Sequence, residues 1–169
     1  MAEPYIPLPS EGASGMKPDG TATATCLCGA VQLSFPVEGD DLVTTFVCNC
    51  TDCHKISSSM FCTNLIVTDK SLTHIRGEDK LTRYSQNRTV ESGAYMEDSF
   101  CSVCGNLMYR RSSRFPGTSV LRVGTVDDFN LHATKLKPRF EAYTRDRVAW
   151  FDGVKIEGIP RYADGGPKR

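Results

Sequence analysis

The sequence has no long hydrophobic run, no excess of either charge and no leader-like start. Its longest aliphatic runs are as short as the one at 65–67, far below the roughly 20 residues that span a bilayer. The start, from Met1 to Pro9, has neither the basic nor the apolar region of a secretory signal. The 20 basic residues balance 20 acidic ones, so the field typical of nucleic-acid-binding chains is missing. We therefore expect a cytoplasmic protein with no membrane or nucleic-acid partner.

The length indicates one folded domain. A chain of 169 residues with 40% hydrophobic content has room for one modest core and is short for two. Residues 1–20 hold four of the nine prolines and three glycines without any periodic pattern, so we expect a flexible N-terminal arm there. A flexible tail is expected at 161–169, which leaves 21–160 as the domain.

Inside that domain the pattern is strand-like. Apolar residues alternate with polar ones at 31–35, and β-type runs follow at 42–48, 60–67, 94–100 and 118–124. The only helix-like stretch is short and lies at 52–57. The sequence thus predicts a mainly β fold with short helical turns.

Charge is unevenly distributed although it sums to zero. Residues 1–100 carry 7 basic and 13 acidic groups, and residues 101–169 carry 13 and 7. The simpler interpretation is that the basic residues of the second part are ordinary solvated side chains. The more specific interpretation is that a few of them line a pocket for a carboxylate-bearing ligand. The candidates are Arg110, Arg111, Arg114, Lys135, Lys137, Arg139, Arg145 and Arg147.

Seven of the eight cysteines fall into three clusters. In a reducing compartment such clusters more often bind metal than form disulfides. Two separated pairs, Cys26 with Cys28 and Cys101 with Cys104, supply the four thiolates of a closed structural zinc site, with zinc–sulfur distances near ~2.3 Å. The glycine after each pair is expected at positive φ, which frees backbone amides to point at the thiolates. The alternative is buried thiols without a ligand.

The third cluster, Cys48, Cys50 and Cys53, supplies only three thiolates. Three protein ligands leave one position of a tetrahedral zinc open, as in catalytic sites, where a thiol or water can enter. Cys62 lies nine residues after Cys53 and would instead close the site as a fourth ligand, or be a small core residue. His54 is a proton carrier, a hydrogen-bond donor to a ligand, or simply exposed.

The ordered motifs resemble the glutathione-dependent formaldehyde-activating enzyme family, also grouped with centromere protein V. The resemblance covers about residues 24–150. It is carried by Cys26-x-Cys28-Gly-x-Val, by Cys48-x-Cys50-x-x-Cys53 with Lys-Ile-Ser downstream, by Phe100-Cys-x-x-Cys-Gly, and by the segments 124–128, 136–138 and 147–150.

The resemblance implies a β-tent-like fold with two zinc ions. Cys26, Cys28, Cys101 and Cys104 would hold the structural ion, and Cys48, Cys50 and Cys53 the catalytic one. The implied activity is that of a carbon–sulfur lyase, written in reverse as condensation of glutathione with formaldehyde to S-(hydroxymethyl)glutathione, and basic side chains would face the glutathione carboxylates.

Two positions depart from the family pattern. Asn49 stands where the family usually has His, and Ser57-Ser58 where it has Ser-Gly. We therefore expect a zinc-dependent lyase acting on a thiol adduct, most simply of glutathione, with a related lyase for another small molecule as the nearest alternative. A zinc-stabilised binding module without catalysis is a third hypothesis, and a homo-oligomer is compatible with each.

Overall fold

The computed structural model describes residues 17–167, so most of the arm predicted at 1–20 lies outside the described residues. The strands are β1 (Thr21–Thr25), β2 (Gln32–Pro36), β3 (Leu42–Cys48), β4 (Cys62–Thr68), β5 (Thr73–Arg76), β6 (Leu81–Gln86), β7 (Met96–Cys101), β8 (Leu107–Ser112), β9 (Thr118–Arg122) and β10 (Phe140–Ala142). The helices are α1 (Thr51–Ser57) and α2 (Phe129–Ala133), with 3-10 turns η1 (Asp69–Ser71), η2 (Glu78–Lys80), η3 (Val123–Thr125) and η4 (Thr144–Asp146).

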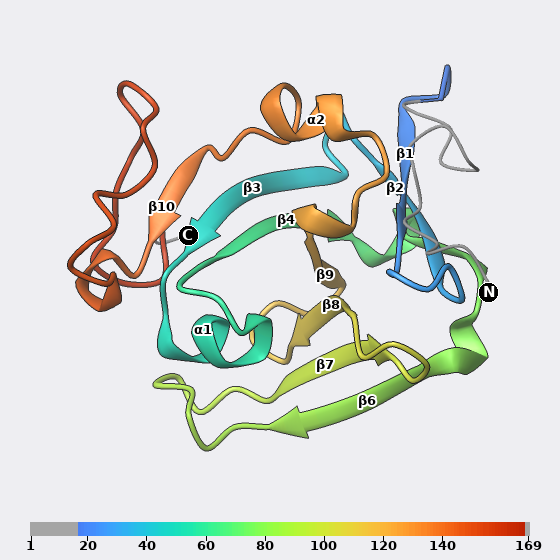
Figure 1. Ribbon diagram of the computed structural model, residues 1–169, viewed down its shortest axis with the longest axis horizontal. Helices are drawn as coiled ribbons and strands as arrows, with labels where there is room; N and C mark the ends of the chain where they lie inside the picture. Colours follow the sequence, from blue (N-terminus) through green and yellow to red (C-terminus); the bar gives the residue numbers. More distant parts are fainter. Residues whose placement is uncertain (1–16, 168–169) are drawn as a thin grey trace, which may run out of the picture.

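The strands form two sheets, which confirms a mainly β fold (Figure 1). The smaller sheet has the order β1-β2-β5, and the larger has the order β10-β3-β4-β9-β8-β7-β6. All neighbours are antiparallel except β10 and β3, which run parallel. No helix among residues 17–167 is long and apolar enough to cross a membrane.

The apolar core lies between the two sheets. Leu33 and Phe35 of β2 pack in one cluster with Leu65 of β4 and Leu121 of β9, and all four are fully buried. Tyr109 of β8 joins this core and its hydroxyl lies 3.3 Å from Nε2 of His74 on β5, which links the sheets. Burial of this apolar surface is the main term that holds the two sheets together.

The other side of the large sheet, which we call the outer face, is polar. Successive side chains of a strand point to opposite sides, so the paired positions Cys48 and Cys62, Asn64 and Arg122, and Asp98 and Arg110 share this face. Helix α1 lies beside it (Figure 1). The fold therefore separates an apolar inner side from an outer side rich in groups that can do chemistry.

The chain after residue 160 continues the large sheet. The sequence assigns this segment to a flexible tail, but the amide of Tyr162 donates to the carbonyl of Glu141 at 2.9 Å, and the amide of Tyr143 donates to that of Asp164 at 2.8 Å. These bonds attach residues 160–164 to the free edge of β10.

Candidate functional site

Four cysteine sulfurs meet where the two sheets approach each other. Cys26 and Cys28 follow β1, Cys101 ends β7 and Cys104 follows it, and their Sγ atoms all lie within 4.8 Å of one another. We call these residues the first cluster. The Sγ separations are 3.6 Å between Cys26 and Cys28 and 3.7 Å between Cys28 and Cys101. A tetrahedral zinc with bonds of about 2.3 Å needs sulfurs about 3.8 Å apart, so the four sulfurs fit one ion.

Two tight turns shape the first cluster. Gly29 and Gly105 have φ of 76° and 73°, and their amides donate to the carbonyls of Cys26 and Cys101. The amide of Val31 points at Sγ of Cys26 at 3.2 Å. The expected positive φ at both glycines is confirmed. Burial raises the pKa of the Cys26 thiol to about 12, so a bound cation is what would favour the thiolate there.

The second cluster consists of Cys48, Cys50 and Cys53, whose sulfurs also lie within 4.8 Å of one another. Cys48 ends β3, and Cys50 caps α1 by accepting the amide of Cys53 on its sulfur at 3.4 Å. Hydrogen bonds from Cys48 and Cys53 lower the pKa of Cys50, with a smaller contribution from Arg110. Cys48 donates its hydrogen bond to the Cys50 sulfur, which raises the pKa of Cys48 to about 12. The three sulfurs thus share negative charge at a largely buried position, and such a set of ligands suits zinc.

Cys62 lies beside the second cluster but outside the set of three mutually close sulfurs. It faces Cys48 across β3 and β4, and its Sγ donates to the carbonyl of Cys53 at 3.4 Å. A separate hydrogen bond from the Cys53 thiol to the Cys62 sulfur lowers the pKa of Cys62 to about 6 against the effect of burial, and Arg122 adds to the lowering. His54 belongs to neither group of mutually close ligand atoms, and within 17–167 its Nε2 is buried without a hydrogen-bond partner.

A buried carboxylate supports the turn between Cys48 and Cys50. The Asn49 amide donates to Oε1 of Glu141 and to the carbonyl of Ala142, both at 3.0 Å. Glu141 has no exposed surface and is paired with Arg147 and Arg161 at 3.4 Å each. The residue that replaces the usual His of the family pattern therefore has a defined structural partner, and sequence reasoning missed it because the partner lies 92 positions away.

A hollow of about 400 Å³ lies on the outer face next to α1. Its lining comes from α1, from the end of β6 and the turn after it, and from the buried pair on β7 and β8: Asp52, Lys55, Ile56, Tyr84, Gln86, Arg88, Thr89, Asp98 and Arg110. Arg110 binds Asp98 with two hydrogen bonds of 2.7 and 3.0 Å. Of the eight basic residues singled out in the sequence, only Arg110 reaches this hollow.

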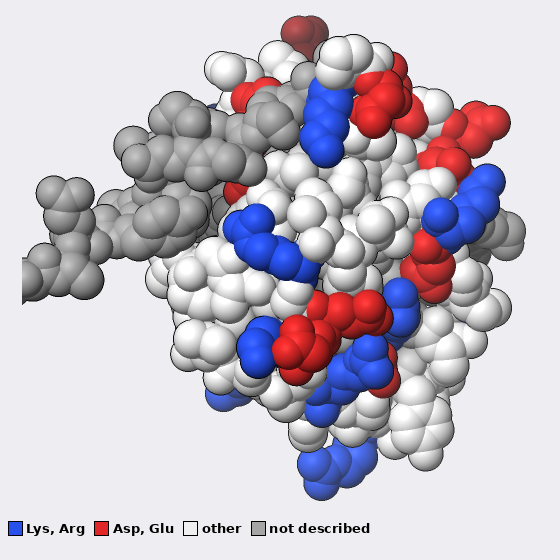
Figure 2. Space-filling model, turned by 90° about the vertical axis from the view of Figure 1, so that its right-hand side faces the viewer, with Lys and Arg blue, Asp and Glu red and all other residues white. Residues whose placement is uncertain are grey.

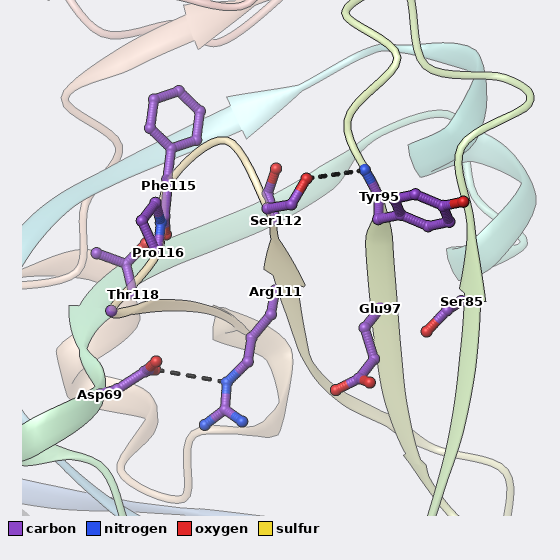
Figure 3. A pocket seen from close by; sticks show the side chains of 11 residues that line it. Asp69, Ser85, Tyr95, Glu97, Arg111, Ser112, Phe115, Pro116 and Thr118 are labelled. Atoms are coloured by element: carbon purple, nitrogen blue, oxygen red, sulfur yellow. Dashed lines mark hydrogen bonds and ion pairs between the residues drawn. The ribbon is translucent and has the colours of Figure 1, made fainter.

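A second hollow of similar size lies elsewhere, lined by Tyr95, Glu97, Arg111 and Phe115 among others (Figure 3). It contains no cysteine or histidine, and its arginine is paired with Asp69 at 3.5 Å and donates to Ser119 at 3.0 Å. On the face of the molecule that Figure 2 shows, basic and acidic side chains lie next to one another. The hollow beside α1 is the one that shares a helix with the second cluster, since Cys53 lies on α1 together with Asp52 and Lys55.

Comparison with known proteins identifies the family and supports the fold. The sequence profile of the glutathione-dependent formaldehyde-activating enzyme family matches residues 21–146. Among solved structures, a Rhodobacter sphaeroides protein is similar with a TM-score of 0.52 and 20% identity, over 66% of this chain and 93% of that one. This likeness shows the fold alone. No curated protein matches the chain.

Proposed function

Because this chain belongs to the glutathione-dependent formaldehyde-activating enzyme family, a family of zinc-binding carbon–sulfur lyases, we propose that it forms or cleaves the carbon–sulfur bond of a small thiol adduct. Glutathione is the proposed thiol and S-(hydroxymethyl)glutathione the proposed adduct. The observation that carries the proposal is the second cluster, in which three cysteine sulfurs converge next to a helix that also lines a hollow.

The two clusters take different proposed roles. Cys26, Cys28, Cys101 and Cys104 would hold a structural zinc ion, since four mutually close sulfurs complete a tetrahedron. Cys48, Cys50 and Cys53 would hold a catalytic ion, because three ligands leave one position free. Zinc bound there would supply Lewis-acid activation, which keeps an incoming thiol deprotonated at neutral pH.

The protein's own residues would then orient the reaction. In the forward direction the glutathione thiol loses its proton, its sulfur attacks the aldehyde carbon, and the aldehyde oxygen takes up a proton to become the hydroxyl of the adduct. The reverse direction breaks the same bond. Arg110 adds positive charge near Cys50 and Cys53, which offsets part of the negative charge that a fourth sulfur would bring.

The test compares the zinc-loaded wild type with Cys53→Ser and Cys62→Ser. Formation of S-(hydroxymethyl)glutathione is followed by exchange NMR, and zinc per chain is measured after gel filtration. We expect two ions and turnover in the wild type, and one ion, an intact fold and no turnover in Cys53→Ser.

Cys62→Ser separates an open site from a closed one. If three cysteines hold the second ion, this variant keeps both ions and its turnover. Loss of the second ion in Cys62→Ser would show that Cys62 closes the site. That result, or full activity in Cys53→Ser, would overturn the proposal.

A further inference from the structure

In the hollow beside α1 the acidic side chains and Arg110 have partners, while the other two basic side chains do not. Asp98 is bound by Arg110, while Asp52 accepts from Gln86 at 3.4 Å and lies 3.9 Å from Arg110. Among the described residues, no side-chain hydrogen bond or ion pair joins the side chain of Lys55 or of Arg88 to a protein group. The lining thus holds three basic and two acidic side chains, an excess of one positive charge, and two of its cations make no side-chain hydrogen bond or ion pair.

These two cations come from different elements and line the same hollow. Lys55 lies on α1, and Arg88 follows the end of β6. Tyr84 also lines the hollow, and its side chain shares the outer face with Asp98. Two separated cations around a space of about 400 Å³ suit a small organic anion better than a bare inorganic ion, because the space is larger than an ion requires.

The hollow and the second cluster share structure. Cys53 lies on α1 between Asp52 and Lys55, both of which line the hollow. Arg110 lines the hollow and also acts on Cys50 and Cys53 through its charge. Because α1 carries both Cys53 and two residues that line the hollow, a small peptide thiol with its sulfur at the second cluster can extend along this helix toward the hollow.

We infer that the hollow beside α1 is a carboxylate-binding subsite, in which Lys55 and Arg88 hold the carboxylate of a small peptide thiol while its sulfur reaches the second cluster. This inference rests on the proposed function for the position of the sulfur. It assigns selectivity for the thiol to Lys55 and Arg88. The sequence shows Lys55 only as part of the Lys-Ile-Ser segment, and neither residue is among the basic candidates because both lie in the acidic part of the chain.

The first experiment measures binding without turnover. S-Methylglutathione keeps both carboxylates of glutathione but has no free thiol, so isothermal titration of the zinc-loaded protein reports the subsite directly. We expect the double variant Lys55→Gln with Arg88→Gln to bind at least about tenfold more weakly than the wild type, as expected for loss of two partly exposed charge contacts. Arg83→Gln is the matched control, because Arg83 lies on β6 next to Tyr84 and points to the opposite side.

The second experiment measures the thiol dependence of the reaction. With formaldehyde, the double variant should raise KM for glutathione by about tenfold and leave kcat within about twofold. With cysteamine, which has no carboxylate, KM should stay unchanged. A general structural defect would instead lower kcat for both thiols.

The outcomes distinguish the subsite from the reaction. Equal binding of S-methylglutathione by the wild type and the double variant, or equal losses in the double variant and Arg83→Gln, overturns the subsite even if turnover is observed. If no thiol is turned over but binding depends on Lys55 and Arg88, the proposed function fails and the subsite stands.

Discussion

The two cysteine clusters are built in opposite ways. The first joins residues from distant parts of the chain, Cys26 after β1 and Cys101 at the end of β7, and so links the small sheet to the large one. The second draws all three sulfurs from one short segment, 48–53, that connects β3 to α1. The first lies beside the apolar core, and the second lies on the polar outer face.

This difference supports the proposed division of roles, in which the first cluster serves stability and the second chemistry. A ligand set that spans the chain would couple folding to metal binding. A set from one segment fixes little of the fold, so a metal held there could exchange ligands without unfolding the protein. The outer face also supplies charged groups, Arg110 and Lys55 among them, that a core position would exclude.

The largest expected effect comes from breaking the first cluster. Cys101→Ser should lower the free energy of unfolding by more than about 4 kcal/mol because it removes a ligand that joins the two sheets, and a chelator should unfold the protein. Cys53→Ser should cost far less. Urea denaturation followed by circular dichroism, with and without chelator, measures both. Similar stability in the two variants would contradict the division of roles.

The next effect concerns the charge pair on the outer face. Asp98→Asn leaves Arg110, which is 6% exposed, without its main partner, and we expect a loss of about 3 kcal/mol. Glu97→Gln on the same strand is the control, since its pair with Arg83 at 3.8 Å is more exposed and should contribute less than about 1 kcal/mol. Equal losses of unfolding free energy for Asp98→Asn and Glu97→Gln in urea denaturation would contradict the larger contribution expected from the pair on the outer face.

A smaller effect is expected from the support of the second cluster. Glu141→Gln removes the buried negative charge that accepts a hydrogen bond from Asn49 and pairs with Arg147 and Arg161. We expect it to lower the free energy of unfolding by about 2 kcal/mol. In protein loaded with Co²⁺, the absorption bands of the second cluster should shift while those of the first stay constant. Glu157→Gln, at an exposed position, is the control. Unchanged bands would mean that the turn at Asn49 holds its shape without Glu141.

The smallest effect is expected at the contact between Tyr109 and His74, which joins the two sheets within the core. Tyr109→Phe removes a hydroxyl whose partner is Nε2 of His74, and we expect a loss of about 1 kcal/mol with zinc content unchanged. Thermal unfolding with metal analysis checks both. A loss as large as that of Asp98→Asn would show that the sheets depend on this contact more than on apolar packing.

The cysteine groups were predictable from the sequence because their spacing is local. Each pair or triplet lies within a few residues, so a tight turn brings the sulfurs together whatever the rest of the chain does. Strands such as β3 and β9 were predictable for a similar reason, since apolar and β-branched residues dominate them. The two halves of the first cluster were joined on the same ground, because two separated pairs together supply four thiolates, and the resemblance to a family implied the same set.

The surroundings of the second cluster were not predictable, because they depend on strand pairing. β8 carries adjacent arginines and lacks a clean alternation, yet it is central, since Asp98 on β7 neutralises Arg110. β6 is largely exposed, so no apolar pattern marks it, although it provides one side of the hollow. A short-range sequence pattern does not reveal such partners, because they become neighbours only when the strands pair in their native register.

The backbone hydrogen bonds made by residues 160–164 also cover an edge of the large sheet. β10 is an edge strand of the large sheet, and an unpaired edge is a template for association with another chain. Residues 160–164 occupy that edge by bonding to Glu141 and Tyr143. The same segment brings Arg161 to Glu141, so the part of the chain that blocks edge-to-edge aggregation also neutralises the carboxylate behind the second cluster.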